Sequence, residues 1–269
     1  MIDENHIPHM RRLDYELEAL AYQGDLAIAF SGGIDSTFLL HYAHSLLGNK
    51  VKAFTASSAF FPESELAFSK EFCAENGIEL HIVEIDVLSD PAIVSNPKDR
   101  CYHCKRAIFE RITDAAKSCG CAHVVDGTNV DDMDDYRPGL KALEELGVES
   151  PLKRAGLTKD DIRALSCAMG IEIWDKPAFA CLATRFPYDT ALVRDQLIAV
   201  EHAEQVLHDL GFAQCRVRVH GSDLDVARIE VEPERIADAM DEDVRRSIDS
   251  GLKALGFGRV SVDLAGYGR

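Results

Sequence analysis

A glycine-rich hexapeptide is the first stretch whose residue types and spacing could do chemistry. Ser31-Gly32-Gly33-Ile34-Asp35-Ser36 follows the short apolar run 25–30 and opens a helical pattern. Two glycines let backbone N–H groups point at a ligand without a Cβ in the way, and a helix N-terminus favours an anion. The serines add hydroxyl donors, while Asp35 can orient the loop or hold Mg²⁺. The pattern predicts a phosphate-binding turn at the carboxyl end of a strand.

Two other phosphate-binding loops do not fit the hexapeptide. A Walker A loop needs Gly-Lys-Ser/Thr, and a dinucleotide-binding turn needs Gly-x-Gly-x-x-Gly. Neither pattern stands at this position in the sequence. An ordinary tight turn between a strand and a helix is the alternative interpretation.

Three of the eight cysteines lie in surroundings that suggest chemistry. Cys101 and Cys104 form a Cys-x-x-Cys pair, which by itself lacks two ligands for a structural zinc. Cys181 is flanked by Lys176 and Arg185, whose positive charge favours the thiolate, although a buried core cysteine is the alternative. A dithiol redox pair or ordinary thiols stay open for the first two. The remaining cysteines sit in apolar periodic segments and are expected in the core: Cys73, Cys119, Cys121, Cys167 and Cys215.

A polar stretch should face the same ligand as the hexapeptide, because it follows the fourth expected strand. Asp126 and Asp131 offer carboxylates that can hold Mg²⁺ against phosphates. Thr128 and Asn129 can bond a nucleotide or a substrate. A solvated acidic loop is the alternative.

Two arginines alternate with valines in a third candidate segment. Arg216 and Arg218 therefore project to one face of an expected strand. Arginine pairs grip a single phosphate group well, because the guanidinium binds its oxygens bidentately. An ordinary solvated strand face is the alternative.

Hydrophobic periodicity predicts the elements that position these residues. Strands are expected at 25–30, 51–55, 79–86 and 122–126, and helices at 6–23, 37–47, 63–76 and 104–118. This alternation predicts an α/β parallel sheet with helices on both faces, in a domain over residues 1–185. A smaller α+β domain is expected over 186–269, with a helix at 190–210, helices through 233–255 and strands at 214–219, 224–231 and 258–264.

Composition restricts the class of partner. Among 269 residues, 46 Asp and Glu stand against 29 Lys and Arg, a net charge of −17 that repels polyanions. Nucleic acid is therefore not expected as a partner. No run of 18 apolar residues and no secretory signal pattern are present, so we expect a cytoplasmic protein without a membrane partner.

The hexapeptide matches the SGGxDS signature of the N-type ATP pyrophosphatases, whose loop is called the PP-loop. Together with the segments 96–105, 126–132, 135–139, 174–185 and 216–220, it resembles the LarE family of sulfur transferases over about residues 15–265. The resemblance implies a PP-loop fold, ATP and Mg²⁺ as cofactors, and nucleotide binding by the hexapeptide, the Asp126 stretch, Lys176 and Arg185. It also implies a homo-oligomer that works alongside other proteins of nickel-pincer nucleotide biosynthesis.

The chemistry of the LarE family gives these cysteines an expected role in sulfur transfer. LarE enzymes adenylylate the carboxylates of pyridinium-3,5-biscarboxylic acid mononucleotide and then replace AMP with sulfur. The resemblance implies one of two sulfur sources. Cys181 is sacrificed and becomes dehydroalanine, or Cys101, Cys104 and Cys181 hold a [4Fe–4S] cluster that carries an extra sulfide.

Other chemistries share the same loop. A tRNA thiolase would need a basic surface or an added RNA-binding domain, which the net charge of −17 argues against. An amide-forming synthetase of the NAD synthetase type would have no need of Cys181. A nucleotide-binding module without catalysis would not need it either.

Overall fold

The computed structural model describes residues 6–133, 138–176, 180–221 and 223–268. The chain packs as two compact units, one of Met1–Ile85 with Asp99–Phe179 and one of Asp86–Lys98 with Ala180–Arg269. The predicted domain boundary at residue 185 stays a prediction. The expected motif residues 135–137 and 177–179 lie outside the described residues.

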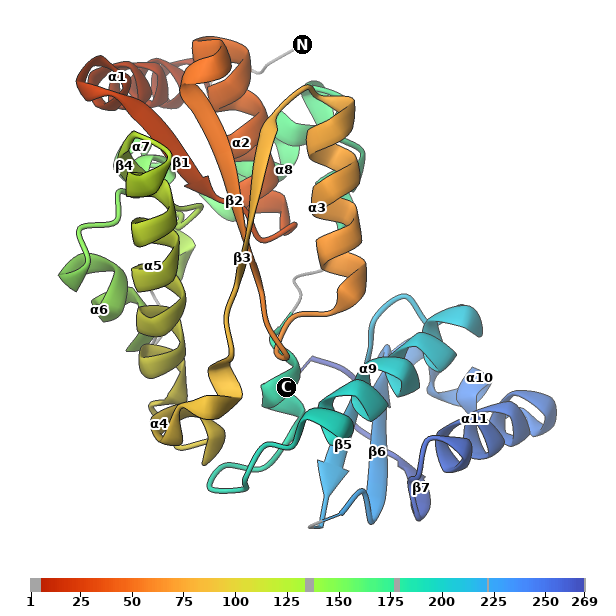
Figure 1. The fold of residues 1–269 in the computed structure, drawn as a ribbon. Helices are drawn as coiled ribbons and strands as arrows, with labels where there is room; N and C mark the ends of the chain where they lie inside the picture. The colour runs from red at the N-terminus through yellow and green to blue at the C-terminus, as the bar shows by residue number, and fades with distance from the viewer. Residues whose placement is uncertain (1–5, 134–137, 177–179, 222, 269) are drawn as a thin grey trace. The chain divides into compact units, whose positions relative to one another are not determined.

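The first unit holds a parallel sheet of four strands, as predicted (Figure 1). The strands are β1 (Asp25–Ala29), β2 (Val51–Ser57), β3 (Glu79–Glu84) and β4 (Cys121–Val125), in the order β3-β2-β1-β4. The order reverses between β1 and β4, and such a switch point is where α/β sheets gather ligands at the strands' carboxyl ends. The loops after β1 and β4 are therefore the expected place for a site.

Helices flank this sheet and confirm the α/β class. The helix α2 connects β1 to β2 and α3 connects β2 to β3, while α5 leads into β4 across the other face (Figure 1). The helices of this unit are α1 (Ile7–Gln23), α2 (Ile34–Leu47), α3 (Glu63–Glu75), α5 (Arg100–Ser118), α6 (Pro138–Glu145), α7 (Pro151–Ala155) and α8 (Lys159–Ala168). Because α5 begins at Arg100, four residues before its predicted start, the Cys-x-x-Cys pair is helical.

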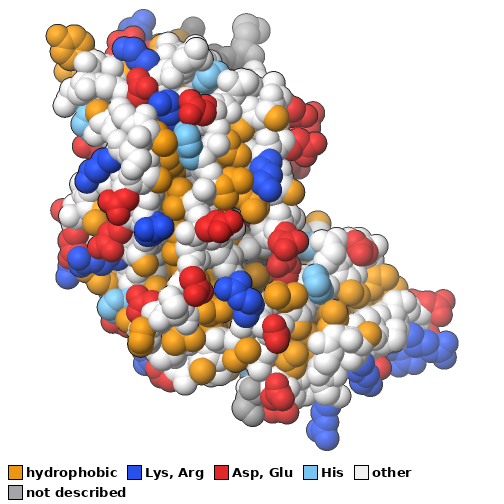
Figure 2. All heavy atoms as spheres, in the orientation of Figure 1, with side chains coloured by type: hydrophobic (Ala, Val, Ile, Leu, Met, Phe, Trp, Pro, Cys, Tyr) orange, Lys and Arg blue, Asp and Glu red, His pale blue; other side chains and the backbone are white. Residues whose placement is uncertain are grey.

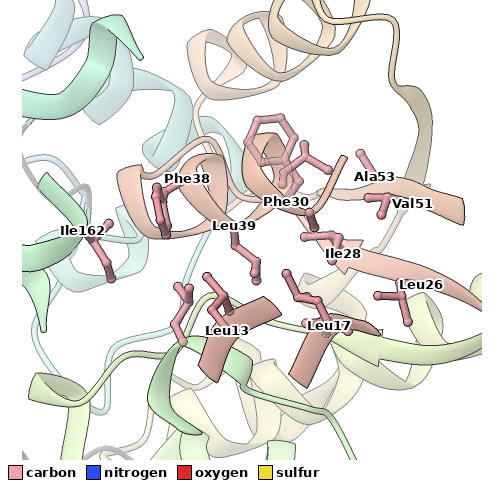
Figure 3. Packing of buried hydrophobic residues seen from close by; sticks show 14 of the residues in the cluster. Leu13, Leu17, Leu26, Ile28, Phe30, Phe38, Leu39, Val51, Ala53 and Ile162 are labelled. Carbon is pink, nitrogen blue, oxygen red and sulfur yellow. The ribbon is translucent and has the colours of Figure 1, made fainter. Parts of the chain in front are cut away.

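Charged side chains of both signs are interspersed over much of the visible surface, and apolar side chains fill the interior (Figures 2 and 3). Leu13 and Leu17 of α1, Ile28 of β1 and Phe38 of α2 are fully buried in one cluster. Ile162 of α8 belongs to the same cluster and lies near Phe38 (Figure 3). This core fixes the start of α2, and with it the loop that carries the hexapeptide.

The second unit is the predicted α+β fold. Its three-stranded sheet pairs β5 (Cys215–His220) antiparallel to β6 (Val226–Val231) and β6 parallel to β7 (Arg259–Val262). Its helices are α4 (Pro91–Val94), α9 (Arg194–Asp209), α10 (Ile236–Ala239) and α11 (Glu242–Ala254).

An inserted segment of the chain, 86–98, belongs to this second unit through Asn96 and Val94. The Asn96 side-chain amide donates to the Pro187 carbonyl at 2.8 Å, and the Leu192 amide donates to the Val94 carbonyl at 2.8 Å. Asn96 is buried with φ 52°, a left-handed conformation that asparagine tolerates. No local sequence pattern indicates these contacts, so residues 86–98 were not expected in the second unit.

Two of the cysteines assigned to the core are not buried. Cys167 is exposed on α8, and Cys119 is partly exposed just after α5. Apolar periodicity places a residue near a helix face but does not decide whether another element covers it, which is why both expectations were wrong. No helix in the part of the chain that the structure describes is long and apolar enough to cross a membrane.

Candidate functional site

The loop after β1 is closed by its own serines. The Ser36 hydroxyl accepts from the Ser31 amide at 3.2 Å and donates to the Gly33 carbonyl at 3.0 Å, and the two serine hydroxyls lie 3.1 Å apart. Gly32 is buried with φ +75°, a conformation that favours glycine. The hexapeptide therefore forms a tight, preorganised turn.

The two glycines of the turn have different roles. The φ of +75° at Gly32 would strain any other residue, and a Cβ there would also lie 2.6 Å from Glu65 Oε2, so the turn favours glycine at this position. Among the described residues, a Cβ on Gly33 would meet only the Ser31 hydroxyl, at 3.6 Å, and Gly33 has an ordinary φ of −77°. The described part of the chain thus leaves the space beside Gly33 open.

The helix α2 begins directly behind this space. Its N-cap residue is Gly33, which has no side chain that could cap the helix, and its first hydrogen bond runs from the Thr37 amide to the Gly33 carbonyl at 3.0 Å. The amides before Thr37 have no carbonyl partner within the helix, and they carry the positive end of its dipole. The turn can therefore cradle a phosphate group, and phosphate binding by the hexapeptide stays a prediction.

The loop after β4 packs against this turn. The Asn129 amide donates to Asp35 Oδ1 at 3.1 Å, which joins two stretches singled out from sequence. Gly127 makes the approach possible, since a Cβ there would lie 2.9 Å from the Ser36 nitrogen. Sequence reasoning missed Gly127, although glycine within a polar loop is a signal of close backbone approach.

Asp126 and Thr128 shape this second loop. The Asp126 carboxylate is buried and accepts from the hydroxyls of Thr128 and Ser150, the latter at 2.6 Å. The Asn129 side-chain oxygen accepts from the exposed Asp131's backbone amide at 2.9 Å. Nucleotide binding by Asp126, Thr128 and Asn129, and Mg²⁺ binding by Asp131, stay predictions.

Two lysines lie on the phosphate loop. The Lys159 ammonium pairs with Asp35, and the backbone amide of Lys159 donates to Asp131 Oδ2 at 2.7 Å. The Lys176 ammonium donates to the Gly32 carbonyl at 3.2 Å and lies 2.7 Å from Glu65 Oε2. The two ammonium groups and the α2 N-terminus suit a polyphosphate, and Mg²⁺ binding by Asp35 stays a prediction.

Lys159 was missed by sequence reasoning, whereas Lys176 was predicted to bind nucleotide. A signal for Lys159 exists, because Thr158 and Asp161 form a capping box that starts α8 at Lys159. That motif predicts a helix start but does not indicate which loop the helix start meets.

The candidate cluster cysteines fall in both units. Cys101 and Cys104 lie near the start of α5, where Cys101 is exposed and Cys104 is buried, and Arg100 Nη2 lies 3.7 Å from Cys101 Sγ. Cys181 is partly buried in the second unit. Thiolates are the ligand type that a [4Fe–4S] cluster needs. Within the described ranges no group of three His, Cys, Asp or Glu side chains is placed to hold a metal, so convergence stays a prediction.

The segment that carries Cys181 is held by Arg185. The buried Arg185 guanidinium donates to both carboxylate oxygens of Glu204, at 2.8 and 2.9 Å, and to the Ala180 carbonyl at 2.6 Å. The Thr184 amide donates to the Cys181 carbonyl at 2.9 Å. These contacts are those of a positioning residue, and nucleotide binding by Arg185 stays a prediction.

Arg185→Ala should destabilise the protein by about 3–5 kcal/mol, because it leaves the Glu204 carboxylate buried without its charge partner. The two side chains are only 3% and 7% exposed. Arg194→Ala is the matched control, since Arg194 pairs with Asp86 at the surface and its loss should cost under about 1 kcal/mol. Urea unfolding measures both, and equal losses would contradict the structural role of Arg185.

The two predicted phosphate-binding arginines lie on β5 and alternate with buried Val217. Arg216 stacks over the Tyr267 ring at 4.6 Å, and its Nε is buried without a hydrogen-bond partner in the described residues. Arg218 pairs with Glu230 and donates to the Thr184 carbonyl at 3.0 Å. Arg216 Nη2 also donates to the Tyr267 hydroxyl at 3.2 Å, and Arg218 contacts the segment that carries Cys181. Phosphate binding by both arginines stays a prediction.

Comparison with known proteins gives the family. Residues 18–97 match the asparagine synthase family. The chain is 40% identical to the pyridinium-3,5-bisthiocarboxylic acid mononucleotide synthase of Lactiplantibacillus plantarum, over 90% of this chain and 86% of that protein. An uncharacterized protein of Synechocystis sp. is 37% identical over 89% of this chain and 88% of its own length.

A more distant relative shares only part of the chain. One subunit of the glutamine-hydrolyzing GMP synthase of Pyrococcus furiosus is 27% identical over 54% of this chain and 49% of that protein. The likeness to the bisthiocarboxylic acid mononucleotide synthase, by contrast, covers nearly the whole length of both proteins. The chain therefore belongs to the LarE family, that of the pyridinium-3,5-bisthiocarboxylic acid mononucleotide synthase, among the PP-loop ATP pyrophosphatases.

Proposed function

We propose that this enzyme adenylylates the carboxylates of pyridinium-3,5-biscarboxylic acid mononucleotide and converts them to thiocarboxylates, in biosynthesis of the nickel-pincer nucleotide. The observation that carries the proposal is the 40% identity to the synthase over 90% of the chain. The open phosphate loop beside Gly33 supports the ATP-dependent half of the reaction. Cytoplasmic location, homo-oligomer formation and partners in lactate racemase maturation stay predictions.

The first half-reaction is AMP transfer. A substrate carboxylate oxygen attacks the α-phosphorus of ATP, the bond to pyrophosphate breaks, and a mixed anhydride with AMP forms. The Ser31 and Ser36 hydroxyls and the first amides of α2 would hold the phosphates in line. Lys159 and Lys176 would offset the charge of the departing pyrophosphate. Mg²⁺, held by Asp35, would neutralise phosphate charge.

The second half-reaction replaces AMP with sulfur. In the sacrificial route the Cys181 thiolate attacks the activated carbonyl carbon and AMP leaves. Loss of the Cys181 α-proton then breaks its Cβ–Sγ bond, which leaves a thiocarboxylate on the substrate and dehydroalanine in the chain. In the alternative route Cys101, Cys104 and Cys181 would hold a [4Fe–4S] cluster, and the chemistry that such a cluster would supply is a sulfide donor.

The test is a reaction of the purified chain with ATP, Mg²⁺ and pyridinium-3,5-biscarboxylic acid mononucleotide. We expect AMP and pyrophosphate in equal amounts, and mass spectrometry should find oxygen replaced by sulfur in the substrate. Bulk tRNA, or ammonia with a nicotinate-type acid, takes the place of the substrate in the controls. Pyrophosphate release in either control but not with the mononucleotide would refute the proposal.

Arg216→Ala should weaken binding of the mononucleotide about 10- to 100-fold, because a charge-assisted hydrogen bond to its phosphate is worth roughly 1.5–3 kcal/mol. ATP affinity should stay nearly unchanged. Calorimetry measures both ligands. Arg259→Ala, which removes an exposed arginine from β7 of the same sheet, is the matched control and should bind both normally. Equal weakening of both ligands in Arg216→Ala would show that Arg216 supports the fold instead.

A further inference from the structure

A second cysteine arrangement lies at the edge of the parallel sheet where the strands begin, opposite the edge that carries the phosphate loop. Cys119 follows α5 and immediately precedes the turn into β4, and its Sγ lies 3.7 Å from His81 Nδ1. His81 Nε2 lies 2.8 Å from Glu79 Oε1 in β3. Thiol, imidazole and carboxylate thus form a chain of three within one compact unit.

The donor and acceptor properties of these three groups define the role of the imidazole. A carboxylate only accepts, so the Nε2 that faces Glu79 carries a hydrogen and donates it. Nδ1 then presents a lone pair to the thiol and can take its proton, and the carboxylate stabilises the resulting imidazolium. The His81 ring stacks on the fully buried Phe54 ring, with centroids 4.7 Å apart and planes 17° apart, which holds Nδ1 in place.

The surroundings of Cys119 differ from those of its neighbour Cys121. Lys52 Nζ donates to the Cys119 carbonyl at 3.0 Å and brings positive charge to this edge. Cys121 is buried, and burial is the main reason that its pKa is raised, so it remains a thiol at neutral pH. Cys119 and His81 are both partly exposed, which leaves a path for a small reagent.

We propose that Cys119 is a nucleophilic thiol, with His81 as its base and Glu79 as the residue that orients His81, and that low-molecular-weight disulfides modify it. The Cys119 sulfur attacks one sulfur of the disulfide, a mixed disulfide forms, and the sulfur–sulfur bond of the reagent breaks. The departing half leaves as a thiolate and takes the proton held by His81. This site is separate from the sulfur transfer proposed for Cys181, because it uses other residues, all of them in the first unit.

The experiment labels the full-length protein at neutral pH with limiting iodoacetamide, and in parallel with glutathione disulfide, and follows each cysteine by peptide mass spectrometry. Cys167 is the internal reference, since it is more exposed than Cys119 and exposure alone would make it the faster. Cys73 reports on the fold, because it is buried and burial raises its pKa to about 11.

We expect Cys119 to react about tenfold faster than Cys167 with both reagents, since thiolate content controls the rate. His81→Gln should bring Cys119 down to the rate of Cys167 or below, and Glu79→Gln should remove part of the advantage. Slower labelling of Cys119 than of Cys167 in the unmodified protein, or an unchanged rate in His81→Gln, would overturn the proposal. If Cys73 becomes reactive in His81→Gln, that variant is misfolded and Glu79→Gln alone decides, because Glu79 is exposed and its replacement should not disturb the fold. An unchanged labelling rate of Cys119 in Glu79→Gln would then overturn the proposal.

Discussion

Gly33→Val should abolish AMP transfer, with a loss of about 100-fold or more, while the protein stays folded. The backbone at Gly33 has φ −77°, which any residue adopts, and an added Cβ meets only the Ser31 hydroxyl at 3.6 Å. The valine side chain would therefore fill the space in front of the α2 amides, where the phosphates are expected. Substrate-dependent release of pyrophosphate measures the loss, and thermal unfolding measures the fold.

Gly32→Ala separates blockage of a ligand from damage to the loop. At Gly32 an added Cβ would lie 2.6 Å from Glu65 Oε2 and the backbone has φ +75°, so this variant should lose stability as well as activity. Only activity should fall in Gly33→Val. Normal AMP transfer by Gly33→Val would exclude this turn as the phosphate site. A fall in thermal stability equal to that of Gly32→Ala would mean that Gly33 serves the fold.

Local patterns were sufficient to predict the sheet. Strands and helices alternate along residues 25–125 with clear changes of period, and right-handed crossovers then leave few ways to arrange a parallel sheet. The hexapeptide could be interpreted as a phosphate loop because local contacts close the turn, such as the bond from the Ser36 hydroxyl to the Gly33 carbonyl.

Contacts between distant residues could not be predicted in the same way. Lys159 meets Asp35 across 124 positions, and Lys176 meets Gly32 across 144 positions. Helix α8 reaches the site through tertiary packing of Ile162 in the core, which no short sequence window shows. A single sequence therefore predicts which loop binds phosphate more readily than which lysines lie beside it.

The signs of the charges in the sequence also did not predict which residues form ion pairs. Arg185 was expected to favour the Cys181 thiolate and to bind nucleotide, yet its guanidinium is engaged by Glu204, a residue of α9. The sequence shows that the Arg185 charge lies close to Cys181, but it does not show that the Glu204 carboxylate neutralises this charge. Because both side chains are buried, the main contribution of this ion pair is to the stability of the fold.

Cys181→Ala should abolish thiocarboxylate formation and leave adenylylation intact. Activation needs only the phosphate loop, Mg²⁺ and the substrate carboxylate, so the variant should release pyrophosphate and accumulate the AMP-bound substrate. Mass spectrometry of the small molecules measures both products. Cys167→Ala is the matched control, because Cys167 is an exposed thiol on α8 and its loss should leave both half-reactions unchanged. Full sulfur transfer by Cys181→Ala would contradict the sacrificial and the cluster routes together.

Replacement of Cys101 or Cys104 then distinguishes the two sulfur sources. If the three cysteines hold a cluster, protein purified without oxygen should be brown with iron and sulfide, and loss of either α5 cysteine should stop repeated turnover. If Cys181 is sacrificed, the protein should be colourless and turnover should stop after about one sulfur per chain, since each chain has one Cys181. The intact mass should then fall by the elements of one H₂S, with dehydroalanine at position 181. Cys101→Ala should transfer sulfur normally in that case, because a sacrificial thiol needs no partner cysteine.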